Sequence, residues 1–94
     1  MTQSLDERSR VTISPSVYAR PFGEEVVLLE FGRGEYFGLD AIGAAVWRSF
    51  EAGHDLGTTA DHIVERYEVS REEALRDIVD LVAQLRNHEL LVVP

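Results

Sequence analysis

The sequence predicts a small α+β domain in which a three-stranded antiparallel sheet is followed by three helices. Short apolar and aromatic runs, separated by Gly and Pro, occupy residues 11–39 and are typical of strands. Beyond them apolar residues recur at helical spacing, and Asp40 and Ser70 stand before two of these stretches as helix N-caps. This order of elements is winged-helix-like.

Composition limits the kinds of function that the chain can have. Its 94 residues suggest one domain, and the absence of Cys excludes disulfides, thiolate metal sites and a Cys nucleophile. A formal charge of −8 argues against nonspecific nucleic-acid binding, which needs Lys and Arg to neutralise phosphates. No apolar run is long enough to span a bilayer, and the polar residues 1–10 do not form a secretory signal. We therefore expect a cytoplasmic protein with no membrane partner.

The N-terminal part is expected to hold a tail and the first strand. Residues 1–10 have little apolar content and are predicted to be a flexible tail, so that the folded domain covers residues 11–94. Val11–Ile13 alternates like a strand, which we expect to continue over Val17–Arg20 beyond an irregularity at Pro15. Pro21-Phe22-Gly23 then predicts a turn.

Two further strands complete the predicted sheet. Glu24–Phe31 has a continuously apolar middle, which favours a central position. Gly32-Arg33-Gly34 is typical of a hairpin turn because glycine accepts a positive φ. Glu35–Leu39 follows as the last strand of the meander, with aromatic residues suited to a half-buried pleated surface.

The first two helices are predicted from spacing and caps. One helix is expected over Asp40–Glu51, ended by Gly53 in a left-handed conformation. The second is expected to be capped by Thr58 or Thr59 and to run through Tyr67.

The third helix carries an unusually wide apolar surface. A capping box, Ser70-Arg71-Glu72-Glu73, predicts its start, and we expect it to end near Asn87. Its predicted core stripe is widened on two shoulders beyond the arc of about 100° that a surface helix needs; the apolar positions are Ala74, Leu75, Ile78, Val79, Leu81, Val82 and Leu85. One shoulder is lined by Asp77, Leu81, Gln84 and His88, and we expect something to cover it. Leu90–Val93 is an apolar tail or a last strand.

Our central hypothesis concerns the edge of the last predicted strand. Neighbouring side chains on a strand point to opposite faces, so Phe37 and Leu39 are expected to face the core and Tyr36 to face outward. We expect the Glu35–Leu39 edge to be left open for a guest peptide.

No residue pattern predicts catalysis or a cofactor. His54, His62 and His88 lack ligand spacing on any one helix, so we expect no metal. The glycines around Arg33 lead into a strand rather than a helix and do not form a phosphate loop. Trp47 is expected in the core.

The pattern of glycine and apolar positions resembles the PqqD-like family, whose members are recognition elements for precursors of ribosomally made, modified peptides (RiPPs). The resemblance spans Val11–Val93 and rests on Val27-Leu28-Leu29, Gly34-Glu35-Tyr36-Phe37-Gly38-Leu39-Asp40, Gly43, Val46-Trp47, Gly53, Tyr67-Glu68-Val69, Ala74, Asp77-Ile78, Leu85 and Leu90-Leu91. It is most similar to the stand-alone leader-binding proteins of lasso-peptide clusters. The Pro-Glu element usual after the Leu-Leu strand of members from the PQQ pathway is missing, since Leu29 is followed by Glu30-Phe31-Gly32.

The resemblance implies peptide binding by β-augmentation. A precursor's leader segment would add as a strand beside Glu35–Leu39 and rest against the third helix. The residues implied on the strand side are Glu35, Tyr36, Phe37, Gly38 and Leu39, and those on the helix side are Asp77, Leu81, Gln84 and Leu85. Asp77 would pair with a basic leader residue, and a leader Tyr and Pro would need apolar pockets.

Catalysis is then expected of partners. The resemblance implies a separate cysteine-protease-like leader peptidase, to which this non-enzymatic protein would deliver the leader, and an ATP-dependent macrolactam cyclase. Two alternatives stay open: a PqqD-type chaperone for a radical-SAM or other RiPP enzyme, and a winged-helix DNA-binding module.

Overall fold

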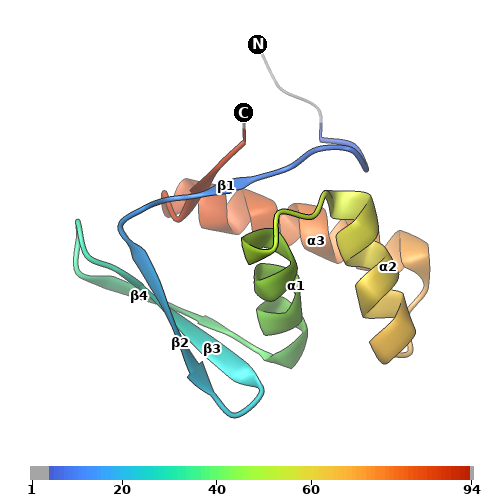
Figure 1. Ribbon diagram of the computed structural model, residues 1–94, viewed down its shortest axis with the longest axis horizontal. Coiled ribbons are helices and arrows are strands. Elements are labelled where there is room, and N and C mark those ends of the chain that lie inside the picture. Colours follow the sequence, from blue (N-terminus) through green and yellow to red (C-terminus); the bar gives the residue numbers. More distant parts are fainter. Residues whose placement is uncertain (1–4, 94) are drawn as a thin grey trace.

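A meander of strands packs on three helices in the computed structural model, which describes residues 5–93 (Figure 1). The elements in chain order are β1 (Thr12–Ile13), β2 (Val17–Phe22), β3 (Glu25–Glu30), β4 (Glu35–Leu39), α1 (Ala41–Glu51), α2 (Leu56–Arg66), α3 (Arg71–Asn87) and β5 (Leu91–Val92). The predicted α+β fold, a three-stranded antiparallel sheet with three helices after it, is confirmed.

The main sheet has the order β2-β3-β4, and the expected first strand is divided in two. Val17 N–H donates to the Ser14 carbonyl at 3.2 Å, a turn that separates β1 from β2 at Pro15. β1 instead pairs antiparallel with β5, the apolar tail after α3. The predicted turn at Pro21-Phe22-Gly23 was placed too early: Pro21 and Phe22 belong to β2, and Gly23, with φ of 61°, begins a tight turn to β3.

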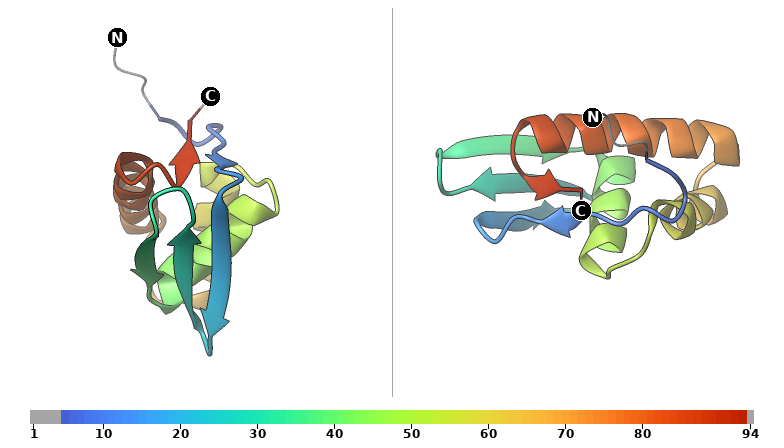
Figure 2. Two further views of the ribbon diagram at one scale, coloured as in Figure 1. Left: turned by 90° about the vertical axis from the view of Figure 1, so that its left-hand side faces the viewer. Right: turned by 90° about the horizontal axis from the view of Figure 1, so that it is seen from above.

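The helices cover one face of the main sheet and leave the other uncovered (Figure 2). On the uncovered face Tyr18 and Tyr36 are 54% and 79% exposed. The core lies between the sheet and the helices; its large, fully buried side chains include Leu28, Trp47, Leu56, Ile78, Val82, Leu85 and Leu91. Trp47 is buried as predicted, although its indole N–H has no hydrogen-bond acceptor among residues 5–93.

Carboxylate and hydroxyl caps begin each helix. Asp40 accepts from Gly43 N–H at 2.8 Å, and Ser70 accepts from Glu73 N–H at 3.1 Å, so these two predicted caps are confirmed. The predicted cap of α2 was wrong, because Asp55 caps the helix from Leu56 by accepting from Thr58 N–H at 2.8 Å. None of the helices within residues 5–93 is long and apolar enough to cross a membrane.

Part of the N-terminal segment packs against α2. Ser9 and Glu7 carbonyls accept from the N–H groups of Leu56 and Gly57 at 3.0 and 2.9 Å. Gly57 permits this approach, since a Cβ there would lie 3.0 Å from Glu7 Cβ. We predicted a flexible tail over residues 1–10; residues 1–4 lie outside the described residues, and the mobility of the remainder stays a prediction.

Candidate functional site

The register of the meander determines which backbone groups of β4 face away from the sheet. Phe31 N–H donates to the Ser16 carbonyl at 3.0 Å, so this opposed pair is hydrogen-bonded, and bonding alternates along an antiparallel ladder. Odd-numbered residues of β3 therefore direct their backbone toward β2, and even-numbered ones toward β4. Since Leu28 opposes Phe37 and Val26 opposes Leu39, the N–H and C=O groups of Tyr36 and Gly38 point to the free edge.

The side chains of β4 divide between the two faces as predicted. Phe37 is half-buried and Leu39 is buried on the helix side. Tyr36 lies on the uncovered face, and Gly38 has no atom within 4 Å of where a Cβ would stand. The absence of a side chain at Gly38 leaves the backbone of the edge accessible beside it.

A buried carboxylate holds the turn that leads into β4. Glu30 accepts from Ser16 Oγ at 2.7 Å and from the N–H groups of Gly32 and Arg33 at 2.9 and 2.7 Å. These hydrogen bonds, the one from Ser16 first, hold the pKa of Glu30 below its ordinary value. The turn is thus fixed from within, and the start of β4 with it.

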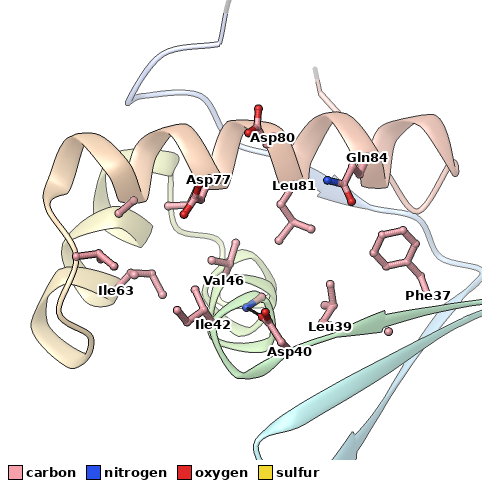
Figure 3. Close-up of a pocket in the computed structure, with 15 residues that line it drawn as sticks. Phe37, Leu39, Asp40, Ile42, Val46, Ile63, Asp77, Asp80, Leu81 and Gln84 are labelled. Atoms are coloured by element: carbon pink, nitrogen blue, oxygen red, sulfur yellow. Dashed lines mark hydrogen bonds between the residues drawn. The ribbon is translucent and has the colours of Figure 1, made fainter.

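An open groove of about 460 Å³ lies between β4 and α3 (Figure 3). β4 contributes Phe37 and Leu39, and α3 contributes Asp77, Leu81 and Gln84 along its facing side. The groove continues beyond the end of β4, where its floor is apolar and comes from α1, α2, the segment before α3 and α3 itself; the residues there are Ile42, Gly43, Val46, Ile63, Val69, Ala74 and Ile78. Leu81 is only half-buried and points into this space.

Contacts between the β3–β4 turn and the end of α3 close the other end of the groove. The rings of Phe37 and His88 meet edge to face with centroids 5.2 Å apart. Arg33, at the tip of the turn, forms ion pairs with Glu35 and with Glu89, which follows α3 in a left-handed conformation with φ of 59°. The two walls are therefore joined at this end and apart at the other.

Most of the predicted site residues meet in this groove. Its lining includes Phe37, Gly38, Leu39, Asp77, Leu81 and Gln84. Tyr36 and Glu35 lie on β4 outside the lining, and Leu85 is fully buried in the core. The residues that sequence reasoning missed are those of the apolar floor, together with Asp40 and Asp80. Their helical spacing marked Ile42 and Ile63 as apolar-face residues but gave no sign that a groove reaches them.

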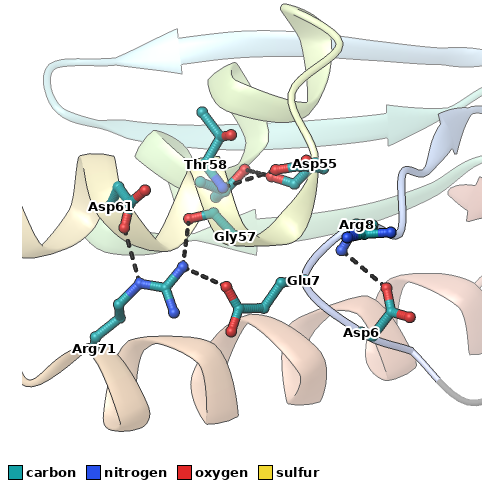
Figure 4. A network of polar contacts seen from close by, with 9 residues as sticks. Asp6, Glu7, Arg8, Asp55, Gly57, Thr58, Asp61 and Arg71 are labelled. Atoms are coloured by element: carbon teal, nitrogen blue, oxygen red, sulfur yellow. Dashed lines mark hydrogen bonds and ion pairs between the residues drawn. The ribbon is translucent and has the colours of Figure 1, made fainter.

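A second hollow, between the N-terminal segment and the starts of α2 and α3, is polar, and its central cation, Arg71, is already paired with carboxylates (Figure 4). Arg71 donates to Glu7 at 2.5 Å and to Asp61 at 2.8 Å. The hydrogen bond from Arg71 lowers the pKa of Glu7, and its two carboxylate partners raise the pKa of Arg71. Residues 5–93 hold no group of three or more His, Asp or Glu able to bind a metal ion. The groove beside β4 is the better candidate site.

Comparisons with known proteins agree on one kind of relative. A family model described as coenzyme PQQ synthesis protein D (PqqD) matches residues 25–91. The solved structure of TbiB1 in complex with the TbiA(β) leader peptide is similar with a TM-score of 0.81 and 40% identity, over 85% of this chain and 93% of that chain. A lasso peptide synthetase B1 complexed with the leader peptide also gives a TM-score of 0.81, at 28% identity, over 88% of this chain and 98% of that one. No curated protein matches significantly.

Proposed function

Because this chain belongs to the PqqD family, as a PqqD-like RiPP recognition element, we propose that it binds the leader segment of a lasso-peptide precursor. The solved relatives are complexes with leader peptides, and the similarity to them extends over most of both chains. The single observation that carries the proposal is an unpaired strand edge with an apolar groove directly beside it.

The leader adds to β4 as a fourth strand of the sheet. The outward N–H and C=O groups of Tyr36 and Gly38 offer two donors and two acceptors, and each main-chain hydrogen bond contributes about 1 kcal/mol net. Selectivity then comes from side chains that enter the groove. Leader residues opposite Phe37 and Leu39 share their face and point at α3.

The groove is suited to holding a peptide rather than cutting it. Its lining, within the described part of the chain, has no Ser, Thr, Cys or His to act as a nucleophile. Processing accordingly belongs to other proteins: this chain delivers the leader to a separate cysteine-protease-like peptidase, and an ATP-dependent cyclase closes the macrolactam. Holding the precursor raises its effective concentration at the peptidase.

Amide hydrogen exchange, followed by NMR, tests both binding and its mode. The ligand is the leader peptide of the precursor that the proposed function expects to be encoded near this chain, added at saturation to the full chain. We expect slower exchange at the Tyr36 and Gly38 amides, and unchanged exchange at Ala19 on the opposite edge of the sheet. Saturable binding that leaves the Tyr36 and Gly38 amides unprotected would reject strand addition. No binding at all would reject leader recognition.

A PqqD-type chaperone for a radical-SAM enzyme is the second candidate, favoured by the description of the matching family model. It uses the same edge and groove but a different partner enzyme. Pull-down of the leader-bound chain with the peptidase and with the radical-SAM enzyme separates the two, since each function predicts retention of one of them. Salt-sensitive binding to duplex DNA without leader binding would instead favour a DNA-binding module.

A further inference from the structure

Three side chains of α3 line the groove one after another, and they are polar, apolar and acidic in turn. Gln84 lies nearest Phe37, Leu81 lies over Leu39, and Asp77 lies beyond the end of β4 (Figure 3). These α3 residues are three and four positions apart, which is about 4.5 and 6 Å along a helix. Inward-facing residues of an added strand recur about every 6.6 Å. The residues of α3 are thus somewhat more closely spaced than the strand repeat, and three successive inward side chains of a guest strand would face Gln84, Leu81 and Asp77 in that order.

The end of the groove beyond β4 is negatively charged and lacks a cation. Asp77 approaches from α3 and Asp40 from the start of α1, on opposite walls. One Asp40 oxygen caps α1, whereas Asp77 has no hydrogen bond or ion pair within residues 5–93. Glu72 is paired with Arg76 and Glu89 with Arg33, whereas Asp80, which also lines the groove from α3, shares with Asp77 the lack of an ion pair within the described residues. No Arg is among the lining residues.

The floor at this end suits a long side chain. Ile42 of α1 and Val69 before α3 are half-buried apolar residues at this end of the groove, and the buried side chains of Val46 and Ile63 lie behind its lining. The methylene stem of Arg or Lys can cover such a surface while its charged end reaches a carboxylate at the rim. A short acidic or polar side chain would leave the apolar floor wet and would be repelled by the two aspartates.

We propose that the groove selects a leader with Arg or Lys at one defined position. That position is the inward-facing residue two places beyond the one opposite Leu39, where the chain passes between Asp40 and Asp77. The preceding inward residue, against Leu81, is apolar. This inference rests on the proposed leader binding and adds to it the type of side chain that the groove favours at two leader positions.

The test measures anisotropy of a fluorescein-labelled leader peptide from the neighbouring precursor gene, with each Arg or Lys replaced in turn by Gln. Against the wild-type chain, one replacement should weaken binding about three- to tenfold, as expected for a partly desolvated charge pair. The Asp77→Asn variant should lose a similar factor with the unchanged leader. The affinity of the Asp77→Asn variant should not fall further when the leader also lacks the essential Arg or Lys, because the charge pair is already broken.

A matched control separates local pairing from net charge. Glu65→Gln removes one negative charge from an exposed position of α2 outside the groove, and binding should change less than twofold. Charge reversal gives a sharper test. Asp77→Lys should weaken binding of the wild-type leader more than Asp77→Asn does. A leader with Glu in place of the essential Arg or Lys should restore part of the affinity that the Asp77→Lys variant has lost.

Failure of this inference differs from failure of the proposed function. If the wild-type chain binds the leader and the Asp77→Asn variant binds every peptide as well as the wild type does, the proposed pairing of Asp77 with a leader Arg or Lys is wrong, while leader recognition stands. Equal losses for Asp77→Asn and Glu65→Gln would also reject it. If the wild-type chain does not bind the leader, the proposed function itself is rejected. Thermal unfolding of each variant checks that it is folded.

Discussion

The main sheet has two free edges, and they differ in both backbone and surroundings. On β2, the alternation of the ladder directs Val17, Ala19 and Pro21 outward. Val17 N–H is already bonded to Ser14, and Pro21 has no N–H to offer. On β4, Tyr36 and Gly38 both keep an outward donor, and the groove runs beside them.

The difference shows how one sheet can protect one edge and keep the other available. Proline and local turns are common ways to blunt an edge against unwanted pairing. The edge of β4 has neither and instead faces a wall, α3, that joins the strand only at the hairpin end through the ring contact of Phe37 and His88. An edge becomes a selective site when a second surface beside it can read side chains.

The largest expected effect comes from placing proline on the β4 edge. Gly38→Pro removes an outward N–H and puts a ring where the guest backbone would lie. We expect leader affinity to fall about a hundredfold or more, about 3 kcal/mol, by calorimetric titration. Ala19→Pro makes the matched change on the β2 edge and should leave affinity within about threefold. A folded Gly38→Pro variant with unchanged affinity would reject the β4 edge as the site.

The next effect tests the wall beside that edge. Leu81→Asp places a charge where a guest side chain should be buried, and we expect about a tenfold to thirtyfold loss of affinity. Val79→Asp is the control, because Val79 is 37% exposed on α3 and does not line the groove. Both variants should keep the cooperative unfolding of the wild type. If Leu81→Asp alone fails to fold, Leu81 belongs to the core.

A smaller effect is expected from the turn that leads into β4. Because the pKa of Glu30 is lowered in the folded chain, its carboxylate stabilises the fold fully above the ordinary pKa of 4.5. This contribution to stability is lost as the pH falls through the lowered pKa. Glu30→Gln should therefore lower Tm at pH 7, and the difference from wild type should narrow as the pH is taken below 4. In the β2–β3 turn the Glu24 side chain accepts no backbone hydrogen bond within residues 5–93, so Glu24→Gln should leave Tm at pH 7 unchanged.

The smallest effect concerns the blunted edge. Pro21→Thr restores an outward donor to β2, and no residue of β2 lines the groove beside β4. We expect one leader per chain by calorimetry, as for the wild type, because no wall lies beside β2. A second site of similar affinity would mean that a free backbone edge suffices without a groove.

Local signals were enough for much of the fold. The hairpin at Gly34, the caps Asp40 and Ser70 and the long helix after Ser70 depend on neighbours in sequence, and sequence reasoning found them. Asp55 as the cap of α2 was missed, because Thr58 and Thr59 are also good cap residues and follow three and four positions later. The glycine in the first turn, Gly57, has a tertiary reason, since the backbone at Glu7 passes too close for a side chain there.

The site was only half predictable for the same physical reason. Alternation along Glu35–Leu39 and the wide apolar arc of the third helix indicated two walls. Spacing alone could not show that Ile42 and Val69 are left half-exposed in a groove, because an apolar face has the same pattern whether or not another element covers it. The bonds of Glu30 across to Ser16 were likewise invisible in the sequence.

The indole of Trp47 is an intrinsic fluorescence probe of the folded core. It is the sole tryptophan, it is almost fully buried, and its N–H meets no acceptor in the described part of the chain. Its emission should therefore lie toward the blue and shift to the red on denaturation. Because Trp47 is absent from the lining of the groove, that emission monitors the integrity of the interior without responding directly to an occupant.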